Sequence, residues 1–346
     1  MKLYTDISHY EGRKDWKHVP HVIRPFFERN GETDRLAEAY FAGSLQDADY
    51  AVLPMTPEYY MISNRRALMD AFIKKAHDAG KPIIVFNDGD AGVRCPFPQD
   101  VIVLRQNAYQ SRRKPNEFGN SFIVEEDPMQ EYFRQTGIVV REKGNRPVVG
   151  FDGLGGETLA MTVYHTLVNL FMNFKCYTHL SIYEPNRLLP GTTIRFKALE
   201  LLEKDERIVA NFNRRSEFRA GAKTPEEQRQ KTTEFYTNML ESDYVLCVRG
   251  GGNFSKRLYE TLAMGRIPVL INTDCVLPFD NIIDWKKYVV WVEQSDIKHI
   301  TDKLVAFHES LSNDEFKALQ CSCRELWEKH LNRAGVLASL GSLIKV

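Results

Sequence analysis

Apolar and polar positions alternate in two different rhythms along the first half of the chain. Short apolar runs occur at KLYT (2–5), YAVLP (50–54), PIIVFN (82–87) and VIVLR (101–105). Runs of this kind are typical of buried strands, and the residues between them carry apolar side chains at helical spacing. Strands that alternate with helices predict parallel sheets covered by helices, and hence an α/β fold.

One helix is predicted between the second and third of these strands, within residues 63–80. Leu68, Phe72 and Ile73 give its apolar face. Ser63 is a suitable N-cap because its hydroxyl can accept a backbone hydrogen bond, and Gly80 is a candidate for the C-terminal end.

The charged stretch REKGNRP, which ends at Pro147, suits a linker between two units. Beyond it the pattern resumes, with strands at 148–156, 207–212, 244–248, 267–271 and 288–292 and helices at 158–172, 193–204 and 225–241. We therefore expect two doubly wound, Rossmann-like domains, 1–143 and 147–320, facing one another across a cleft. A helical C-terminal segment, 321–346, could cross back onto the first half.

Composition narrows the function classes. The chain has 346 residues, and its 46 basic residues balance 46 acidic ones. This balance argues against a surface that generally binds nucleic acid or adsorbs to membranes, although a local basic site remains compatible. Apolar segments are shorter than a membrane span, the N-terminus lacks a signal-peptide pattern, and no CxxC pair occurs. We expect a cytosolic protein without structural disulfides or zinc.

The stretch YVLCVRGGGNFSKRLYE, residues 244–260, passes from a strand pattern through three glycines into a helix pattern. Glycines let backbone N–H groups approach a ligand, and Ser255 can cap a helix whose N-terminus favours anions. Arg249 and Arg257 add charge that suits a diphosphate. The spacing is neither GxGxxG nor GxxxxGK[ST], so a tight turn with solvated arginines is the alternative. Glu260, one turn beyond Lys256, could accept both ribose hydroxyls of a nucleotide or form an ordinary ion pair.

Several motifs in order resemble the C-terminal half of the exostosin family of glycosyltransferases (family 47). They are S-x-Y-x-L-C-x-R-G at 242–250, S-x-R-x-x-E at 255–260, G-x-I-P-V at 265–269, L-P-F at 277–279 and I-D-W at 283–285. The resemblance is strong from about 192 to 297 and looser before it. It implies a GT-B architecture, a UDP-sugar donor on the C-terminal domain, an acceptor on the N-terminal domain, inversion at the anomeric carbon and no metal requirement. Because the membrane anchor of eukaryotic members is missing here, a soluble enzyme of bacterial or viral type is expected.

The donor site is predicted at the strand-to-helix turn. Arg249, Arg257 and the helix N-terminus would stabilise the departing diphosphate. One of Arg214 and Arg215, which follow the strand at 207–212, would add a second contact, and the other would be solvated or ion-paired. The full set of predicted donor-binding residues is Arg249, Gly250, Gly251, Asn253, Ser255, Lys256, Arg257, Glu260, Arg214 and Arg215.

The general base is expected from the first half. Asp88 and Asp90 follow the strand PIIVFN and flank a glycine, and family members carry an aspartate in the equivalent loop, although no histidine follows Asp90 here. Either could instead belong to an Asp-Gly turn, and the DGD sequence could hold a metal with a diphosphate. Asp152, in the first loop of the C-terminal domain, could face the cleft or serve a turn. Arg105, Arg112 and Arg113 could meet an anionic acceptor or lie on the surface.

The sequence thus predicts an inverting, metal-independent glycosyltransferase that moves a sugar from a UDP-sugar to a glycan hydroxyl. The UDP-sugar is a co-substrate and no cofactor is expected; neither is nucleic-acid binding or stable membrane insertion. The alternatives are a transferase that uses ADP- or GDP-sugars and a catalytically silent protein that binds nucleotides or glycans on the same fold. The sugar and the acceptor are not specified by the sequence.

Overall fold

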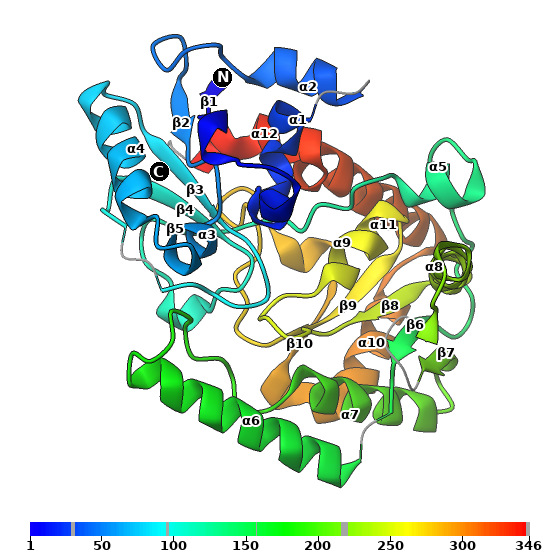
Figure 1. Ribbon diagram of the computed structural model, residues 1–346. Helices are drawn as coiled ribbons and strands as arrows, with labels where there is room; N and C mark the ends of the chain where they lie inside the picture. The colour runs from blue at the N-terminus through cyan, green and yellow to red at the C-terminus, as the bar shows by residue number, and fades with distance from the viewer. Residues whose placement is uncertain (29–31, 95–96, 157, 216–220, 344–346) are drawn as a thin grey trace.

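The computed structural model describes residues 1–28, 32–94, 97–156, 158–215 and 221–343 (Figure 1). Within these residues, two parallel five-stranded sheets organise the chain. The first contains β1 (Leu3–Tyr4), β2 (Tyr50–Val52), β3 (Ile83–Asn87), β4 (Val101–Arg105) and β5 (Glu117–Gly119). The second contains β6 (Val148–Leu154), β7 (Val209–Arg215), β8 (Tyr244–Cys247), β9 (Ile267–Asn272) and β10 (Val290–Glu293). The predicted α/β class with two parallel sheets is confirmed.

Helices connect and cover the strands. In the first half they are α1 (Arg24–Phe27), α2 (Glu32–Tyr40), α3 (Pro57–Ile62), α4 (Arg66–Asp78) and α5 (Pro128–Phe133). In the second half they are α6 (Leu159–Tyr177), α7 (Gly191–Lys204), α8 (Pro225–Leu240), α9 (Lys256–Ala263), α10 (Ile300–Ser310), α11 (Asn313–Leu326) and α12 (Arg333–Ser339). None of the helices in the described ranges combines the length and hydrophobicity that crossing a bilayer requires.

Strand order differs between the two sheets. The first sheet runs in chain order from β1 to β5, whereas the second has the order β10-β9-β8-β6-β7. Strand β7 therefore lies on one side of β6, and β8, β9 and β10 lie on the other. The strand order reverses between β6 and β8, as in doubly wound sheets. Ligands of open α/β sheets bind at the carboxyl ends of the strands beside such a reversal. The second sheet thus offers a binding position that the first sheet does not.

Local details depart from the sequence pattern at α4. Ser63 is not its N-cap: Ser63 ends the separate helix α3, and its hydroxyl donates to the Tyr59 carbonyl. Asn64, with φ of 55°, separates the two helices, so α4 begins at Arg66. Gly80 adopts φ of 64° just beyond the last turn of α4, which is the conformation expected of a glycine after a helix C-cap.

The C-terminal segment crosses back onto the first half, as expected. The Leu331 carbonyl accepts a hydrogen bond of 2.7 Å from the Ser121 hydroxyl, and Arg333 Nε donates to the His21 carbonyl over 3.1 Å. Figure 1 shows α12 beside α1 and the N-terminal strands. The crossing ties the last helix of the chain to its first elements.

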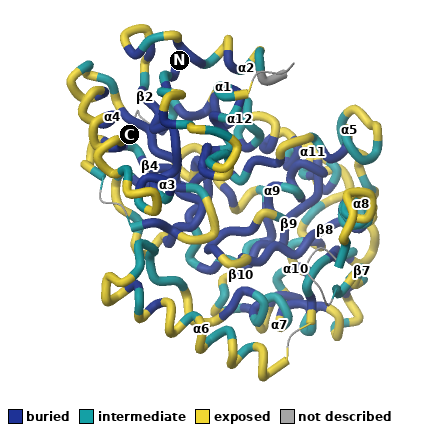
Figure 2. The backbone as a smooth tube through the Cα atoms, viewed as in Figure 1, coloured by how far each residue is buried: buried dark blue, intermediate teal, exposed yellow. Residues whose placement is uncertain are grey.

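Contacts between the halves are extensive, and one cluster of buried apolar residues includes strands of both sheets (Figure 2). A smaller cluster joins Met129 of α5 to Tyr236, Met239, Val245 and Met264. Packing on the second half thus begins at α5, ahead of the linker at 141–147. The domain limits drawn from the sequence, 1–143, 147–320 and 321–346, stay predictions.

Candidate functional site

A cavity of about 670 Å³ lies where β6 and β8 end, beside the strand reversal of the second sheet. Its wall includes five basic and three acidic side chains. The lining residues are Asp90, Asp152, Gly153, Leu154, Arg195, Arg215, Gln228, Lys231, Thr232, Phe235, Val248, Gly250, Gly251, Phe254, Ser255, Lys256, Arg257 and Glu260. Of these, Asp90 alone comes from the first half, so the cavity is shared unequally between the two sheets.

The three glycines after β8 do not form a left-handed turn, and one of them, Gly252, allows close packing. None of Gly250, Gly251 and Gly252 has a positive φ. A β-carbon on Gly250 would meet nothing within 4 Å, whereas one on Gly252 would lie 2.7 Å from the backbone oxygen of Asp90. The sequence predicts that these glycines let backbone N–H groups approach a ligand; in the structure Gly252 lets the loop after β3 pack closely against this turn.

Arg257, in the first turn of α9, is the central cation of the wall. Its guanidinium carbon lies 4.3 Å from the centroid of the Phe151 ring and 5.6 Å from that of Phe235, and Nη2 donates to the Asp152 carbonyl over 2.7 Å. Among the residues that the structure describes, no carboxylate forms an ion pair with it. Burial lowers the pKa of Arg257. A buried cation with two aromatic neighbours and no carboxylate partner is poised to bind an anion.

The remaining α9 residues line the same wall. Ser255 occupies the N-cap position but its side chain makes no capping hydrogen bond, and Lys256 is exposed with Nζ 5.0 Å from the Phe122 ring centroid. Glu260 lies one turn further along the helix. Burial raises the pKa of Glu260, while the charges of Arg257 and Lys256 act in the opposite direction. Helix N-terminus, lysine, arginine and glutamate are thus brought together as the sequence predicted.

Arg214 and Arg215 point to different environments. Arg215 lines the cavity and forms a bidentate ion pair with Asp152, with distances of 2.5 and 2.7 Å. These hydrogen bonds raise the pKa of Arg215. Arg214 lies outside the lining and pairs with Glu200 and Glu203 over 3.3 and 2.6 Å. Asp152 therefore faces the cleft but is neutralised by its arginine.

Besides Arg214, two residues of the predicted donor-binding set lie outside the cavity lining. Arg249 is buried, and its guanidinium donates to the Leu189 carbonyl in the loop before α7. Asn253 is fully buried and fastens the two halves together, because its Nδ2 donates to the Ala108 carbonyl over 2.9 Å and its backbone amide donates to Asn107 Oδ1 over 2.7 Å. Both side chains therefore bond to neighbouring loops and hold the turn in place, and neither lines the cavity.

The two candidate bases also separate. Asp90 is exposed and lines the cavity, where its Oδ2 lies 3.6 Å from the position of a β-carbon on Gly251. Asp88 points elsewhere: its Oδ1 accepts a 2.6 Å hydrogen bond from Asn120 Nδ2, and burial raises its pKa. In the described ranges no group of three or more histidine, cysteine, aspartate or glutamate side chains could hold a metal ion. The carboxylates of the DGD sequence thus face different surroundings.

Three arginines considered as acceptor contacts hold the structure together. Arg105 is buried between Glu117 and Glu184, with a distance of 3.0 Å to Glu117 Oε1. Arg113 pairs with Asp280 of the second half, and Arg112 Nη1 donates to the Pro185 carbonyl over 3.1 Å. Their contacts account for their positions without a ligand.

Sequence reasoning missed part of the wall. Arg195 of α7 donates to the Leu154 and Arg249 carbonyls over 3.2 and 3.4 Å. One face of α8 also borders the cavity: it presents Gln228 together with Lys231 and Thr232, which follow Gln228 by three and four residues. That spacing is visible in the sequence, but nothing local tells which face of α8 meets the cavity.

Residues 197–306 match the Exostosin GT47 domain. This range includes α9 and most of the cavity wall. It covers neither the first sheet nor β6, so the match concerns part of the second half of the molecule.

Similar curated proteins match over short segments. A probable glucuronosyltransferase 47 A of Physcomitrium patens is 41% identical over 71 residues, 20% of this chain and 16% of that protein. A probable beta-1,4-xylosyltransferase, IRX10L, of Arabidopsis thaliana is 37% identical over 68 residues, 20% of this chain and 16% of that protein. Exostosin-1 of Drosophila melanogaster is 31% identical over 106 residues, 30% and 13% of the two chains. The chain therefore aligns with about a sixth or less of the length of these relatives.

Solved structures align over nearly the whole chain but at low similarity. A glycosyltransferase from Rickettsia africae gives a TM-score of 0.38 at 9% identity, covering 99% of this chain and 97% of the other. HepE of Anabaena, solved with UDP and glucose, gives 0.35 at 12% identity, covering 99% and 98%. The architecture given above rests on the strands of this chain itself.

Proposed function

We propose that this protein is a glycosyltransferase that binds a UDP-sugar in the cavity at the ends of β6 and β8. It would transfer the sugar to a glycan hydroxyl with inversion and without a metal ion. Arg257 carries the proposal: it is a cation held in the cavity wall, in the first turn of α9, with no carboxylate partner among the described residues. The Exostosin GT47 match over 197–306 supports the same reading.

The donor diphosphate would bind at the start of α9. Arg257 and Lys256 supply positive charge, and the first amides of the helix supply hydrogen-bond donors that no side-chain cap occupies. Glu260, one turn along, would accept the two ribose hydroxyls. Because the wall is preformed, its cations would not need to reorganise as charge develops on the leaving phosphate, and a preorganised donor of this kind contributes roughly 3–4 kcal/mol.

Asp90 is the favoured general base. It belongs to the first half, lies exposed at the cavity wall and has no ion pair with any residue that the structure describes, whereas Asp88 is held by Asn120. As the acceptor oxygen attacks the anomeric carbon, its proton passes to the Asp90 carboxylate. The bond from the anomeric carbon to the phosphate oxygen breaks, and its electron pair leaves with the diphosphate. Attack from the face opposite the leaving group inverts the configuration.

Calorimetric titration with UDP, ADP and GDP in the presence of EDTA tests the donor site, followed by a screen of UDP-sugars for transfer. The proposal expects UDP to bind most tightly and EDTA to have no effect. Preference for ADP or GDP would favour the transferase alternative, and UDP binding without turnover of any UDP-sugar would favour a silent binding protein. Loss of binding with EDTA would overturn the metal-free mechanism. The expectation of a cytosolic protein stays a prediction.

A further inference from the structure

Helix α6 carries its polar side chains inward and its apolar side chains outward. Thr162, Thr166, Asn169 and Asn173 are spaced by four, three and four residues, so they share one face. That face packs on the loop before α7: Asn173 Nδ2 donates to the Asn186 carbonyl over 2.7 Å, and the Asn186 amide donates back to Asn173 Oδ1 over 2.8 Å. Rotating the helix to bury its apolar side would break these hydrogen bonds. They therefore keep the polar side of α6 against the protein and its apolar side toward solvent.

The outward side is strongly apolar. Exposed fractions reach 81% at Leu159, 64% at Tyr164, 59% at Leu167 and 62% at Phe171. Further exposed apolar residues on the helix are Met161, Val163, Val168, Leu170, Met172, Phe174 and Tyr177. At 3.6 residues per turn these side chains span about 220° of the helix circumference. Figure 2 shows α6 as an exposed element at the lower edge of the molecule.

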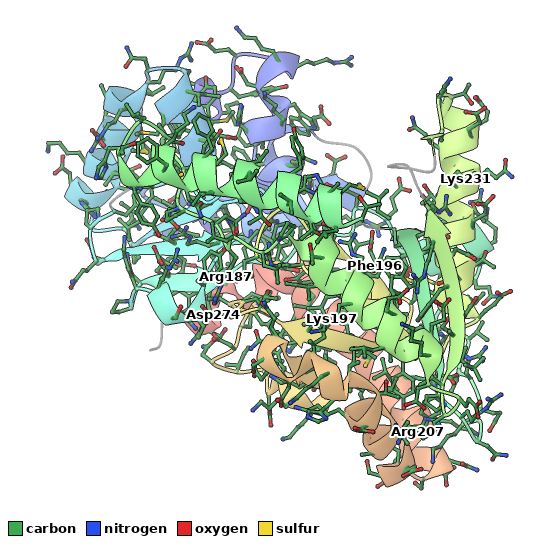
Figure 3. All side chains as sticks on the ribbon, turned by 90° about the horizontal axis from the view of Figure 1, so that it is seen from below. Arg187, Phe196, Lys197, Arg207, Lys231 and Asp274 are labelled. Atoms are coloured by element: carbon green, nitrogen blue, oxygen red, sulfur yellow. The ribbon has the colours of Figure 1, made fainter. Side chains whose placement is uncertain are left out.

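Helix α6 carries a lysine and no acidic residue. No aspartate or glutamate occurs from Thr158 to Tyr183, and Lys175 on the helix lies with Nζ 5.8 Å from the Phe171 ring centroid. Lys197 of α7 is exposed on the face that Figure 3 views from below, the same face that carries α6. Arg187 on this face is paired with Asp274 over 2.9 Å and is therefore neutralised. One lysine thus stands near the C-terminal end of the apolar side of α6, and a second lies on the neighbouring helix α7.

We propose that α6 docks the protein onto an anionic phospholipid surface, lying in the plane of the headgroups. An interfacial helix combines a broad apolar side with flanking basic residues, and α6 has both. Acyl chains can surround a protruding ridge of about 220°, whereas a protein partner would cover mainly the side that faces it. The helix does not qualify as a membrane span, which agrees with binding along the surface. The balance of 46 basic and 46 acidic residues holds for the whole chain and does not give the charge of this one face.

Docking through α6 would place the cavity next to the lipid surface. The helix begins five residues after Leu154, which lines the cavity, and near its other end the Cys176 carbonyl accepts a 2.7 Å hydrogen bond from Arg94 of the first half. Both halves would therefore be held along the surface. The inference concerns partner binding and does not depend on the proposed transferase activity.

Sedimentation with vesicles tests the proposal directly. The full chain is mixed with vesicles of phosphatidylcholine and phosphatidylglycerol in a 7:3 ratio, and with vesicles of phosphatidylcholine alone. The test variant combines Leu167→Ser, Leu170→Ser and Phe171→Ser on α6. The matched control combines Ile7→Ser, Ile62→Ser and Ile282→Ser, which remove equally exposed apolar side chains (56%, 55% and 49%) elsewhere.

We expect the natural protein and the control to bind the anionic vesicles, and the α6 variant to lose at least about tenfold in partitioning. Lys175→Gln and Lys197→Gln should each cost roughly fivefold on anionic vesicles and little on neutral ones. A Phe171→Trp variant should show a blue-shifted emission on binding, and this readout does not depend on tolerance of the triple change. Equal loss in both triple variants, or no vesicle binding at all, would overturn the proposal. So would concentration-dependent dimers that the α6 changes abolish, since the occupant would then be a second copy of the chain.

Discussion

A β-carbon on Gly252 would stand 2.7 Å from the backbone oxygen of Asp90, so the glycine turn after β8 and the loop after β3 are packed backbone against backbone. The two residues come from different sheets. Their contact fixes how closely the first half approaches the cavity at the end of the second sheet. The glycine is therefore a determinant of the relation between Asp90 and the α9 wall.

Gly252→Ala should destabilise the protein by about 1–3 kcal/mol, because the new methyl group can only be accommodated by moving backbone. Gly250→Ala is the matched control: its β-carbon meets nothing within 4 Å and its φ is not positive, so a change within about 0.5 kcal/mol is expected. Urea unfolding of both variants measures the difference. Equal midpoints would show that the halves separate without cost and would remove the packing role of Gly252.

Arg257→Gln should weaken UDP binding by about a hundredfold, because it removes the charge that the cavity wall offers to a diphosphate. Arg214→Gln is the matched comparison, since Arg214 lies near the end of the neighbouring strand β7 but pairs with Glu200 and Glu203 outside the cavity. Calorimetry should give an affinity within about threefold of the natural protein for that variant. If both variants lose affinity alike, long-range charge rather than direct contact explains the binding.

How far the sequence predicts this site depends on how local each feature is. The strand, turn and start of α9 follow one another from 244 to 260. The shared face of Arg257 and Glu260, three residues apart, follows from the helix period, and Ser255 stands beside them as the N-cap. Arg249 lies in the same motif, yet its side chain is drawn away by the Leu189 carbonyl. That contact joins residues 60 positions apart, which no local pattern contains.

The fold shows the same division. Alternating strands and helices predicted two parallel sheets, because each element follows from its own hydrophobic period. The strand order and the face of each helix depend on tertiary packing. Lys231 of α8 and Arg195 of α7 reach the cavity only because those helices flank it, and α6 presents its apolar side to solvent because its asparagines bind the loop at Asn186. Strand β5 was not recognised in the sequence, because its residues, Glu-Phe-Gly, contain a single apolar side chain and form no apolar run.

Asp90→Asn should lower the rate of sugar transfer by about 10²–10⁴-fold while UDP affinity stays nearly unchanged, because the change removes the proton acceptor and leaves the α9 wall intact. Rates at saturating donor, together with calorimetric UDP binding, separate the two effects. Asp88→Asn should change mainly stability, since Asp88 bonds Asn120 away from the cavity. A large rate loss in Asp88→Asn with a normal rate in Asp90→Asn would reverse the assignment.

Glu260→Gln should separate binding from stability. The ionised carboxylate is the expected partner of the two ribose hydroxyls, so the variant should bind UDP at least about tenfold more weakly.

Yet burial raises the pKa of Glu260, which means that the folded state carries its ionised form at a cost. That cost is fully present above the folded-state pKa and disappears as the pH falls through it toward the lower unfolded value. Glu260→Gln should therefore stabilise the fold at pH 8 and have little effect on its stability at pH 4. Thermal unfolding at both pH values measures this gain. A variant that is destabilised equally at both would show that the carboxylate is needed for packing, and its role in nucleotide binding would then lose its main support.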